Sequence, residues 1–332
     1  MSYRDGGNYF KERFIEIYIC KQIIGTGCYM LKLKSVCKDY IWGGDKLKSL
    51  YGRQNGEHLA ESWEVSVHPD GTSMYLASFA DYIKNNPQTV DKQGSDFPVL
   101  IKHIDAKQNL SVQVHPDDEY ARRVEDDNGK TEMWYIIQAD DGAGIYCGFQ
   151  RDTSKTEFLQ KLQEGSVEEL LNFIPVKAGD CYLIPAGTVH AICAGCLICE
   201  VQQSSNVTYR IYDYNRKGAD GKPRPLHIDK AFEVIDFHKF KDKTNSGRYK
   251  DIQGNKLRLL TSCKYFCCRE LILNGAYEDV DTKSFTAVNI IEGEGAADGQ
   301  PFRAGDSFFV PCGERFALNG KGKIILTTEN NG

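Results

Sequence analysis

The chain has 332 residues, of which 41% are hydrophobic and 26% charged; this is the composition of an ordinary globular protein, and the length allows two domains of about 100–200 residues. The formal net charge of -5 excludes the broad basic face that nucleic acids require, although a local group of arginines and lysines can still bind a small anion. Twelve cysteines without the spacing of a secreted disulfide framework indicate reduced thiols, so we expect a cytoplasmic protein with no nucleic-acid partner.

Residues 1–29 differ in character from the rest of the chain. Their apolar run is interrupted by Glu16 and Lys21, which makes it too short and too charged to span a membrane and a poor signal peptide. A regularly patterned sequence begins at Met30. We therefore expect residues 1–29 to be an N-terminal extension outside the fold, and we expect no membrane partner.

Short strands dominate the sequence from Met30 onward. Runs of alternating apolar and polar residues, separated by Gly, Asp and Pro, predict strands at 62–68, 109–115, 132–139, 142–149, 180–187, 196–203 and 208–214. Helices are predicted at 154–165, where Ser154 and Glu157 form a capping box, at 166–174, and as a connection at 224–237. Further strands are predicted at 266–273, 286–293, 306–313 and 323–328. Many short strands with few helices predict a mainly β protein built as sandwiches or barrels.

One turn pattern occurs twice. The stretches GDCYLIPAGTVH (179–190) and GDSFFVPCGERF (305–316) both read Gly-Asp, four residues, then Pro-x-Gly. This repeat predicts two β units, which we divide into residues 30–226 and 227–332. The first copy ends in His190 and the second in Phe316, at a position that begins the next strand and faces the interior. We expect the first unit to bind a metal and the second to be metal-free.

Two pairs of polar residues upstream of His190 fit this expectation. Gln113 and His115 are two residues apart, as are Lys130 and Glu132, so each pair lies on one face of a strand. Two imidazoles, a carboxylate and an amide oxygen, completed by water, can hold a metal with an open position. These donors suit Zn²⁺, but Fe²⁺ and Mn²⁺ accept similar ligands.

Four segments together are similar to the type I mannose-6-phosphate isomerases of the short bacterial kind, which belong to the cupin superfamily. The segments are LSVQVHPDDEYA (110–121), KTEMWYII (130–137), IPAGTVHAI (184–192) and YRIYDYNR (209–216). The resemblance runs from about Met30 to the C-terminus. It implies two cupin-type jelly-roll units, a sugar phosphate substrate, and one zinc ion per chain bound by Gln113, His115, Glu132 and His190.

The resemblance also implies that Arg210 is catalytic, and it matches Glu200 and Arg216 to an acidic and a basic position of the family pattern. One position departs from the family, because an aspartate is frequent four residues before the arginine and this chain has Asn206. The identity of the general base therefore stays open between Glu200, a metal-bound hydroxide and Lys130.

The implied reaction interconverts mannose 6-phosphate and fructose 6-phosphate through an enediol. A guanidinium at Arg210 suits either the developing enediolate or the phosphate, because it stays charged and binds two oxygens at once. Further phosphate candidates are Arg216, Lys102 and Ser111.

Two other functions compete with the isomerase. A metal-dependent cupin dioxygenase often uses histidines and one glutamate, but not Gln-x-His followed by Lys-x-Glu. A non-catalytic sugar-binding cupin would not need Arg210 and Glu200, although Asn206 leaves this alternative open. For any of these we expect a monomer or a weak homo-oligomer.

Overall fold

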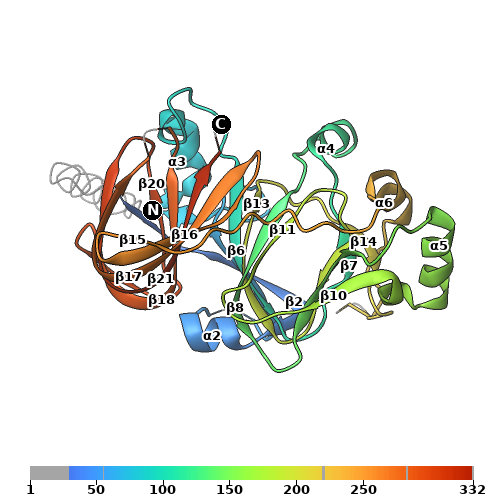
Figure 1. Ribbon diagram of the computed structural model, residues 1–332. Coiled ribbons are helices and arrows are strands. Elements are labelled where there is room, and N and C mark those ends of the chain that lie inside the picture. The colour runs from blue at the N-terminus through green and yellow to red at the C-terminus, as the bar shows by residue number, and fades with distance from the viewer. Residues whose placement is uncertain (1–29, 55, 219–220, 282, 331–332) are drawn as a thin grey trace, which may run out of the picture.

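The computed structural model describes residues 30–54, 56–218, 221–281 and 283–330, so the predicted extension at 1–29 lies outside it. It consists of three main antiparallel sheets (Figure 1). In spatial order, the eight-stranded sheet contains β1 (Leu31–Leu33), β20 (Ser307–Val310), β18 (Thr286–Ala297), β21 (Arg315–Glu329), β17 (Phe266–Val280), β16 (Asn255–Ser262) and β15 (Lys250–Ile252), with β19 (Gln300–Arg303) paired to β18. The six-stranded sheet contains β11 (Cys181–Ile184), β8 (Glu132–Ala139), β13 (Cys196–Gln203), β6 (Val99–Ala106), β2 (Val36–Gly44) and β3 (Leu59–Val65). The five-stranded sheet contains β10 (Leu171–Pro175), β9 (Gly144–Phe149), β12 (His190–Ile192), β7 (Val112–Val114) and β14 (Tyr209–Tyr212).

Helices are few and short, which confirms the predicted mainly β class. They are α2 (Lys46–Tyr51), α3 (Phe79–Asn85), α4 (Asp118–Val124), α5 (Lys155–Glu164), α6 (Ile228–Val234) and the 3₁₀ turns η1 (Pro87–Thr89) and η2 (Val167–Leu170), beside the small hairpin β4 (Met74–Tyr75) and β5 (Ala77–Ser78). None of the helices in the described ranges is long and apolar enough to cross a membrane. The ten cysteines of the described residues are all free thiols.

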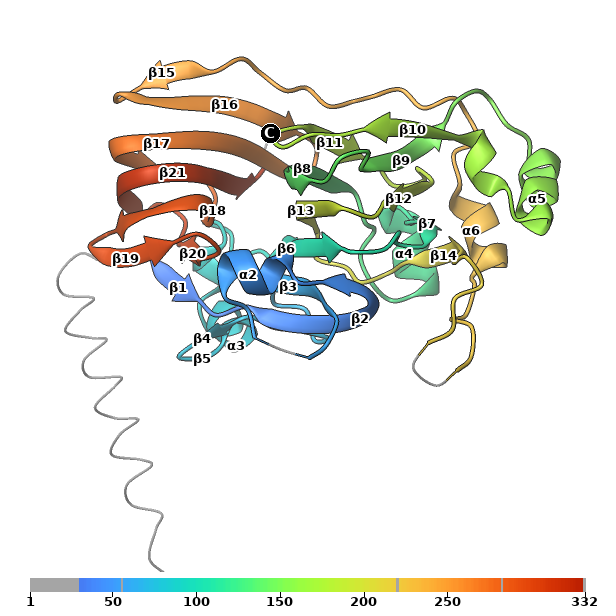
Figure 2. The same ribbon diagram turned by 90° about the horizontal axis from the view of Figure 1, so that it is seen from below.

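The six-stranded sheet is the middle layer of the molecule (Figure 2). Side chains alternate along β8, so Trp134 and Ile136 pack toward the five-stranded sheet, together with Ile145 of β9. Met133 and Tyr135 point the other way and pack against the eight-stranded sheet. The first gap lies between the six- and five-stranded sheets, and the second is filled mainly by apolar side chains that pack the six-stranded sheet against the eight-stranded one.

The repeated turn adopts the same backbone conformation in both copies. Gly187 and Gly313 have φ of 84° and 82°, a left-handed conformation that side chains other than glycine rarely adopt. In the first copy the amide of Gly187 donates a 2.9 Å hydrogen bond to the carbonyl oxygen of His115, which ties the turn to β7. In the second copy Phe316 is buried in an apolar cluster beside Tyr277.

Two predicted helices differ from the structure. The prediction of a helix at 166–174 is wrong, since the segment forms the 3₁₀ turn η2 and then strand β10. Leu171 and Ile174 pair with β9, and β10 thereby completes the five-stranded sheet. The helix expected at 224–237 is shorter, as α6, and it packs against β14 of the first unit. The division near residue 226 stays a prediction, and two segments cross it: α6 packs against β14, and β1 pairs with β20 of the eight-stranded sheet.

Replacing Phe309 by Ala should destabilise the protein by about 3–5 kcal/mol, because the ring is fully buried and its removal leaves a cavity in the core between the eight- and six-stranded sheets. The ring lies among those of Phe79, Phe97 and Phe285. Urea unfolding measures the change. The matched control is Phe173→Ala, whose ring is 43% exposed and should cost far less; equal losses in the two variants would contradict the packing role of Phe309.

Candidate active site

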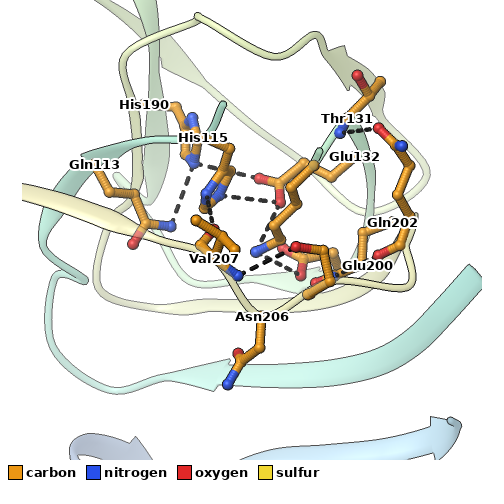
Figure 3. Close-up of polar contacts among 12 residues, drawn as sticks. Gln113, His115, Thr131, Glu132, His190, Glu200, Gln202, Asn206 and Val207 are labelled. Carbon is orange, nitrogen blue, oxygen red and sulfur yellow. Dashed lines mark hydrogen bonds and ion pairs between the residues drawn. The ribbon is translucent and has the colours of Figure 1, made fainter. Parts of the chain in front are cut away.

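The four predicted metal ligands converge between the five- and six-stranded sheets (Figure 3). Strand β7 carries Gln113 and leads directly to His115, and β12 pairs with it so that His190 lies opposite Gln113. Glu132 begins β8 on the facing sheet. Its two carboxylate oxygens lie 3.4 Å from His115 Nε2 and 3.3 Å from His190 Nε2. The structure thus brings together residues from three separate segments of the chain.

Backbone carbonyls fix the orientation of both imidazole rings. His115 donates from Nδ1 to the carbonyl oxygen of Val207 at 2.9 Å, and His190 donates from Nδ1 to that of Thr188 at 2.8 Å. Each neutral ring is therefore left with a lone pair on Nε2, and both lone pairs face the oxygens of Glu132. Acceptor atoms that face each other in a buried site repel, unless a cation lies between them.

The protonation states suit a metal as well. Burial, reinforced by the nearby charge of Lys130, lowers the pKa of His115 to about 3, and burial also lowers the pKa of His190. Burial alone would raise the pKa of Glu132, but the nearby charge of Lys130 opposes it, and that pKa is held well below its ordinary value. At neutral pH the site therefore presents two neutral imidazoles and one carboxylate, which are the forms that bind metals.

Most of these ligand atoms, which are hydrogen-bond acceptors, find no hydrogen-bond donor within the described residues. Both carboxylate oxygens of Glu132 and Nε2 of His115 are buried, and none of these three atoms has a hydrogen-bond partner there. Their ligand atoms and that of His190 lie within 4.8 Å of one another, and no other such group of three His, Cys, Asp or Glu side chains occurs in the described ranges. Gln113 places its amide nitrogen 3.3 Å from His190 Nε2, so a half-turn of the amide would bring its oxygen to the same point. The donor set fits a divalent cation.

A cavity of about 260 Å³ meets this cluster at Gln113, and His115, Glu132 and His190 are not among its lining residues. Six predicted site residues line it, namely Lys102, Ser111, Gln113, Lys130, Glu200 and Arg210. Residues that the sequence analysis did not assign to the site also line it, among them Tyr40, Trp42, Glu61 and Arg224. Tyr40 and Trp42 lie on β2, which was not predicted as a strand, and Arg224 lies in a loop whose position depends on tertiary contacts.

Glu200 lies on the cavity wall in a network of buried charges. The indole Nε1 of Trp134 donates to it at 2.8 Å, and its other oxygen lies 3.0 Å from Lys102 Nζ and 3.9 Å from Lys130 Nζ. Burial and the nearby charge of Glu132 raise the pKa of Glu200, although Lys102 opposes this. These contacts hold Glu200 in one position, with a proton affinity above that of an exposed carboxylate.

Lys102 was predicted as a phosphate contact, which stays a prediction; in the structure it lines the cavity and has two carboxylate partners. Its ammonium lies between Glu200 and Glu61, at 3.0 and 3.6 Å, and Trp63 Nε1 donates to Glu61 at 2.7 Å. Two carboxylates already neutralise the charge of Lys102. Its main contact in the structure is therefore with the acidic wall of the cavity.

Arg210 lies beside Gln113, since the two residues are partners in the register of the neighbouring strands β14 and β7. Arg216, by contrast, does not line the cavity. It pairs with Asp213, donates to the carbonyl oxygen of Asn109 and lies over the ring of Tyr214. The structure thus brings Arg210 to the cavity and directs Arg216 away from it.

Asn206 also lines the cavity, at the position where the family pattern often has aspartate. Its amide donates a 2.7 Å hydrogen bond to Asp70, which follows His68 in a loop. His68 accepts a hydrogen bond from the Asp70 amide at 3.1 Å and takes no part in the ligand cluster.

Comparisons with known proteins agree with the sequence resemblance. Residues 30–151 match the model of the catalytic domain of type I phosphomannose isomerase. The chain is 37% identical to the mannose-6-phosphate isomerase ManA of Bacillus subtilis, over 90% of this chain and 98% of that protein, and 36% identical to the mannose-6-phosphate isomerase of Streptococcus mutans, over 85% and 92%. The crystal structure of the mannose 6-phosphate isomerase from Bacillus subtilis superposes with a TM-score of 0.84 at 32% identity, covering 90% of this chain and 99% of that one.

Proposed function

The chain belongs to the type I phosphomannose isomerase family, and from this premise we propose that it interconverts mannose 6-phosphate and fructose 6-phosphate through an enediol, with zinc as its metal. The observation that carries the proposal is the pair of imidazole lone pairs that face the buried carboxylate of Glu132. A family of aldose–ketose isomerases needs an electrophile at the sugar oxygens, and this donor set is suited to hold one.

We propose that His115, Glu132 and His190 bind the zinc, with Gln113 as a fourth ligand. Nitrogen and carboxylate donors suit Zn²⁺ in an open, catalytic coordination. When bound there, zinc would polarise the sugar's carbonyl and hydroxyl oxygens and make the C2 proton more acidic. Lys130, 3.2 Å from Glu132 and on the cavity wall, adds a second positive charge to this end of the cavity.

Glu200 is our choice for the group that moves the proton between C2 and C1. It lies on the cavity wall, is 2% exposed, and has a raised pKa, which favours both accepting and returning a proton. Asn206 cannot do so, because an amide does not ionise in this range. Trp134 and Lys102 keep the carboxylate of Glu200 in place during the transfer.

Arg210 supplies positive charge that the protein itself does not neutralise. It forms no ion pair with a carboxylate in the described part of the chain, and its Nη1 donates to the carbonyl oxygen of Pro225 at 2.9 Å. Its buried Nε has no acceptor among those residues. The guanidinium is therefore available to an anionic substrate or to the enediolate that forms from it.

Removal of the metal tests the proposed function directly. We expect the purified protein to convert mannose 6-phosphate in a coupled assay, to lose the activity on dialysis against a chelator, and to regain it with Zn²⁺ more fully than with Fe²⁺ or Mn²⁺. Full activity in protein shown to be free of metal would contradict the metal's role. A zinc-loaded protein without isomerase activity would contradict the function itself.

A further inference from the structure

Two guanidinium groups line the cavity, and the second of them belongs to Arg224. Arg210 comes from β14 and Arg224 from the loop before α6. They are close enough for their charges to interact, because burial and then the charge of Arg224 lower the pKa of Arg210. Two cations brought together at a cavity wall create a site for an anion.

Asp213 binds two arginines near the cavity and determines which of their nitrogens point to a carboxylate. Its buried carboxylate accepts from Nε and Nη2 of Arg224 at 2.7 and 2.6 Å, and it also pairs with Arg216. Burial raises the pKa of Asp213, but the hydrogen bonds from the two arginines outweigh it and lower the pKa overall. One carboxylate thus pairs with two guanidinium groups, and Arg210 lies near enough for its charge to be felt, so a local excess of positive charge remains.

The two arginines bound to Asp213 differ in which of their N–H groups already donate hydrogen bonds within the protein. Arg216 uses Nη2 on Asp213, Nη1 on the carbonyl of Asn109 and Nε on the carbonyl of Asp213. Arg224 uses only the edge formed by Nε and Nη2, and no hydrogen bond in the described residues involves its Nη1. Arg224 also lines the cavity, which Arg216 does not.

We propose that Arg224, held by Asp213, is the second guanidinium that binds the substrate's phosphate, beside Arg210; this rests on the proposed function. The assignment replaces Arg216, which the sequence pattern had favoured. A phosphate dianion has enough oxygens to accept from Nε of Arg210 and Nη1 of Arg224 together. It would also relieve the repulsion between the two guanidinium groups.

The test compares Arg224→Ala with Arg216→Ala, because each removes one arginine from Asp213. In the zinc-loaded enzyme, Arg224→Ala should raise the KM for mannose 6-phosphate at least about tenfold with kcat within about threefold, since it removes binding to a group that does not react. The inhibition constant of inorganic phosphate should rise in parallel. Arg216→Ala should change the KM and the inhibition constant of phosphate less than about threefold. Arg224→Lys should recover part of the substrate affinity that Arg224→Ala loses.

Zinc content and melting temperature of both variants show whether the site and fold are retained. Wild-type constants in Arg224→Ala, or equal shifts in the two alanine variants, would overturn the proposal. Calorimetric titration of inorganic phosphate into wild type and Arg224→Ala tests it without turnover. Weaker phosphate binding in the variant supports the phosphate site even if the wild type proves not to be an isomerase, and equal binding in both proteins overturns it.

Discussion

A His190→Phe variant is expected to lose its bound metal and at least about a thousandfold in kcat/KM, equivalent to about 4 kcal/mol of transition-state stabilisation. The imidazole presents Nε2 to Glu132 from a fixed ring, and phenylalanine offers no ligand atom in its place. The same turn already accommodates phenylalanine in the second unit, where Phe316 is buried. We therefore expect the fold to survive the change. Metal analysis by mass spectrometry, circular dichroism and the coupled assay measure the three quantities.

His68→Phe is the matched control for that variant. His68 follows a Val-x-Val run much as His115 does, but in the structure it packs on Trp63 and does not belong to the ligand cluster. It should keep its metal and most of its activity. Metal retained at the wild-type level in His190→Phe, or lost equally from both variants, would contradict the assignment of His190.

Arg210→Ala is expected to lower kcat/KM by about a hundredfold to a thousandfold, the usual loss when a group that stabilises developing negative charge is removed. Its guanidinium lies on the cavity wall and forms no ion pair with a carboxylate among the described residues. Its positive charge can therefore act on a bound substrate. The zinc content should stay at the wild-type level, because the arginine is not one of the ligands. Steady-state kinetics and metal analysis on the same preparation separate these effects.

Arg216→Ala again serves as the control, since it removes a nearby arginine that follows β14 and is bound to Asp213. Wild-type kinetics in Arg210→Ala would remove this arginine from the mechanism. Loss of zinc together with activity would instead indicate a ligand or folding role.

The sequence could indicate that His115, Glu132 and His190 gather because part of the geometry is local, and their role as metal ligands stays a prediction. Residues two apart on a strand must share a face, which places Gln113 beside His115, and the repeated Pro-x-Gly turn indicates where His190 begins its strand. The structure adds that these strands lie in facing sheets, so that Glu132 approaches both imidazoles.

Strand β6 shows why the rest of the site could not be predicted. It lies in the middle layer and is buried on both faces, so its sequence VLIKHIDA lacks the simple alternation of a strand with one exposed face. Lys102 faces the cavity, and His103 faces the opposite side of the sheet, where its Nδ1 lies 3.3 Å from Glu64 of the neighbouring strand β3. Without the layer arrangement, the charge on Lys102 could be assigned to phosphate as easily as to its actual carboxylate partners.

The arginines show a second limit. Arg216 occupies the position that the family pattern favours, yet Asp213 and Asn109 bind it away from the cavity, and Arg224 lines the wall. Sequence spacing cannot distinguish two arginines that share one carboxylate, because their positions depend on the path of the loop. Residues 166–174 show the same limit. Their capping pattern favours a helix, but pairing with β9 at the sheet edge makes the second half of the segment a strand.

The central claim is that one divalent ion joins the N-terminal sheets, and anomalous X-ray diffraction at the zinc edge from crystals of the zinc-loaded protein tests it most directly. We predict one strong peak per chain, about 2.0–2.2 Å from Nε2 of His115, Nε2 of His190 and a carboxylate oxygen of Glu132. The distance to Gln113 will show whether its amide is a ligand. A zinc-loaded active crystal with no peak among these residues, or with its peak elsewhere in the chain, would contradict the claim.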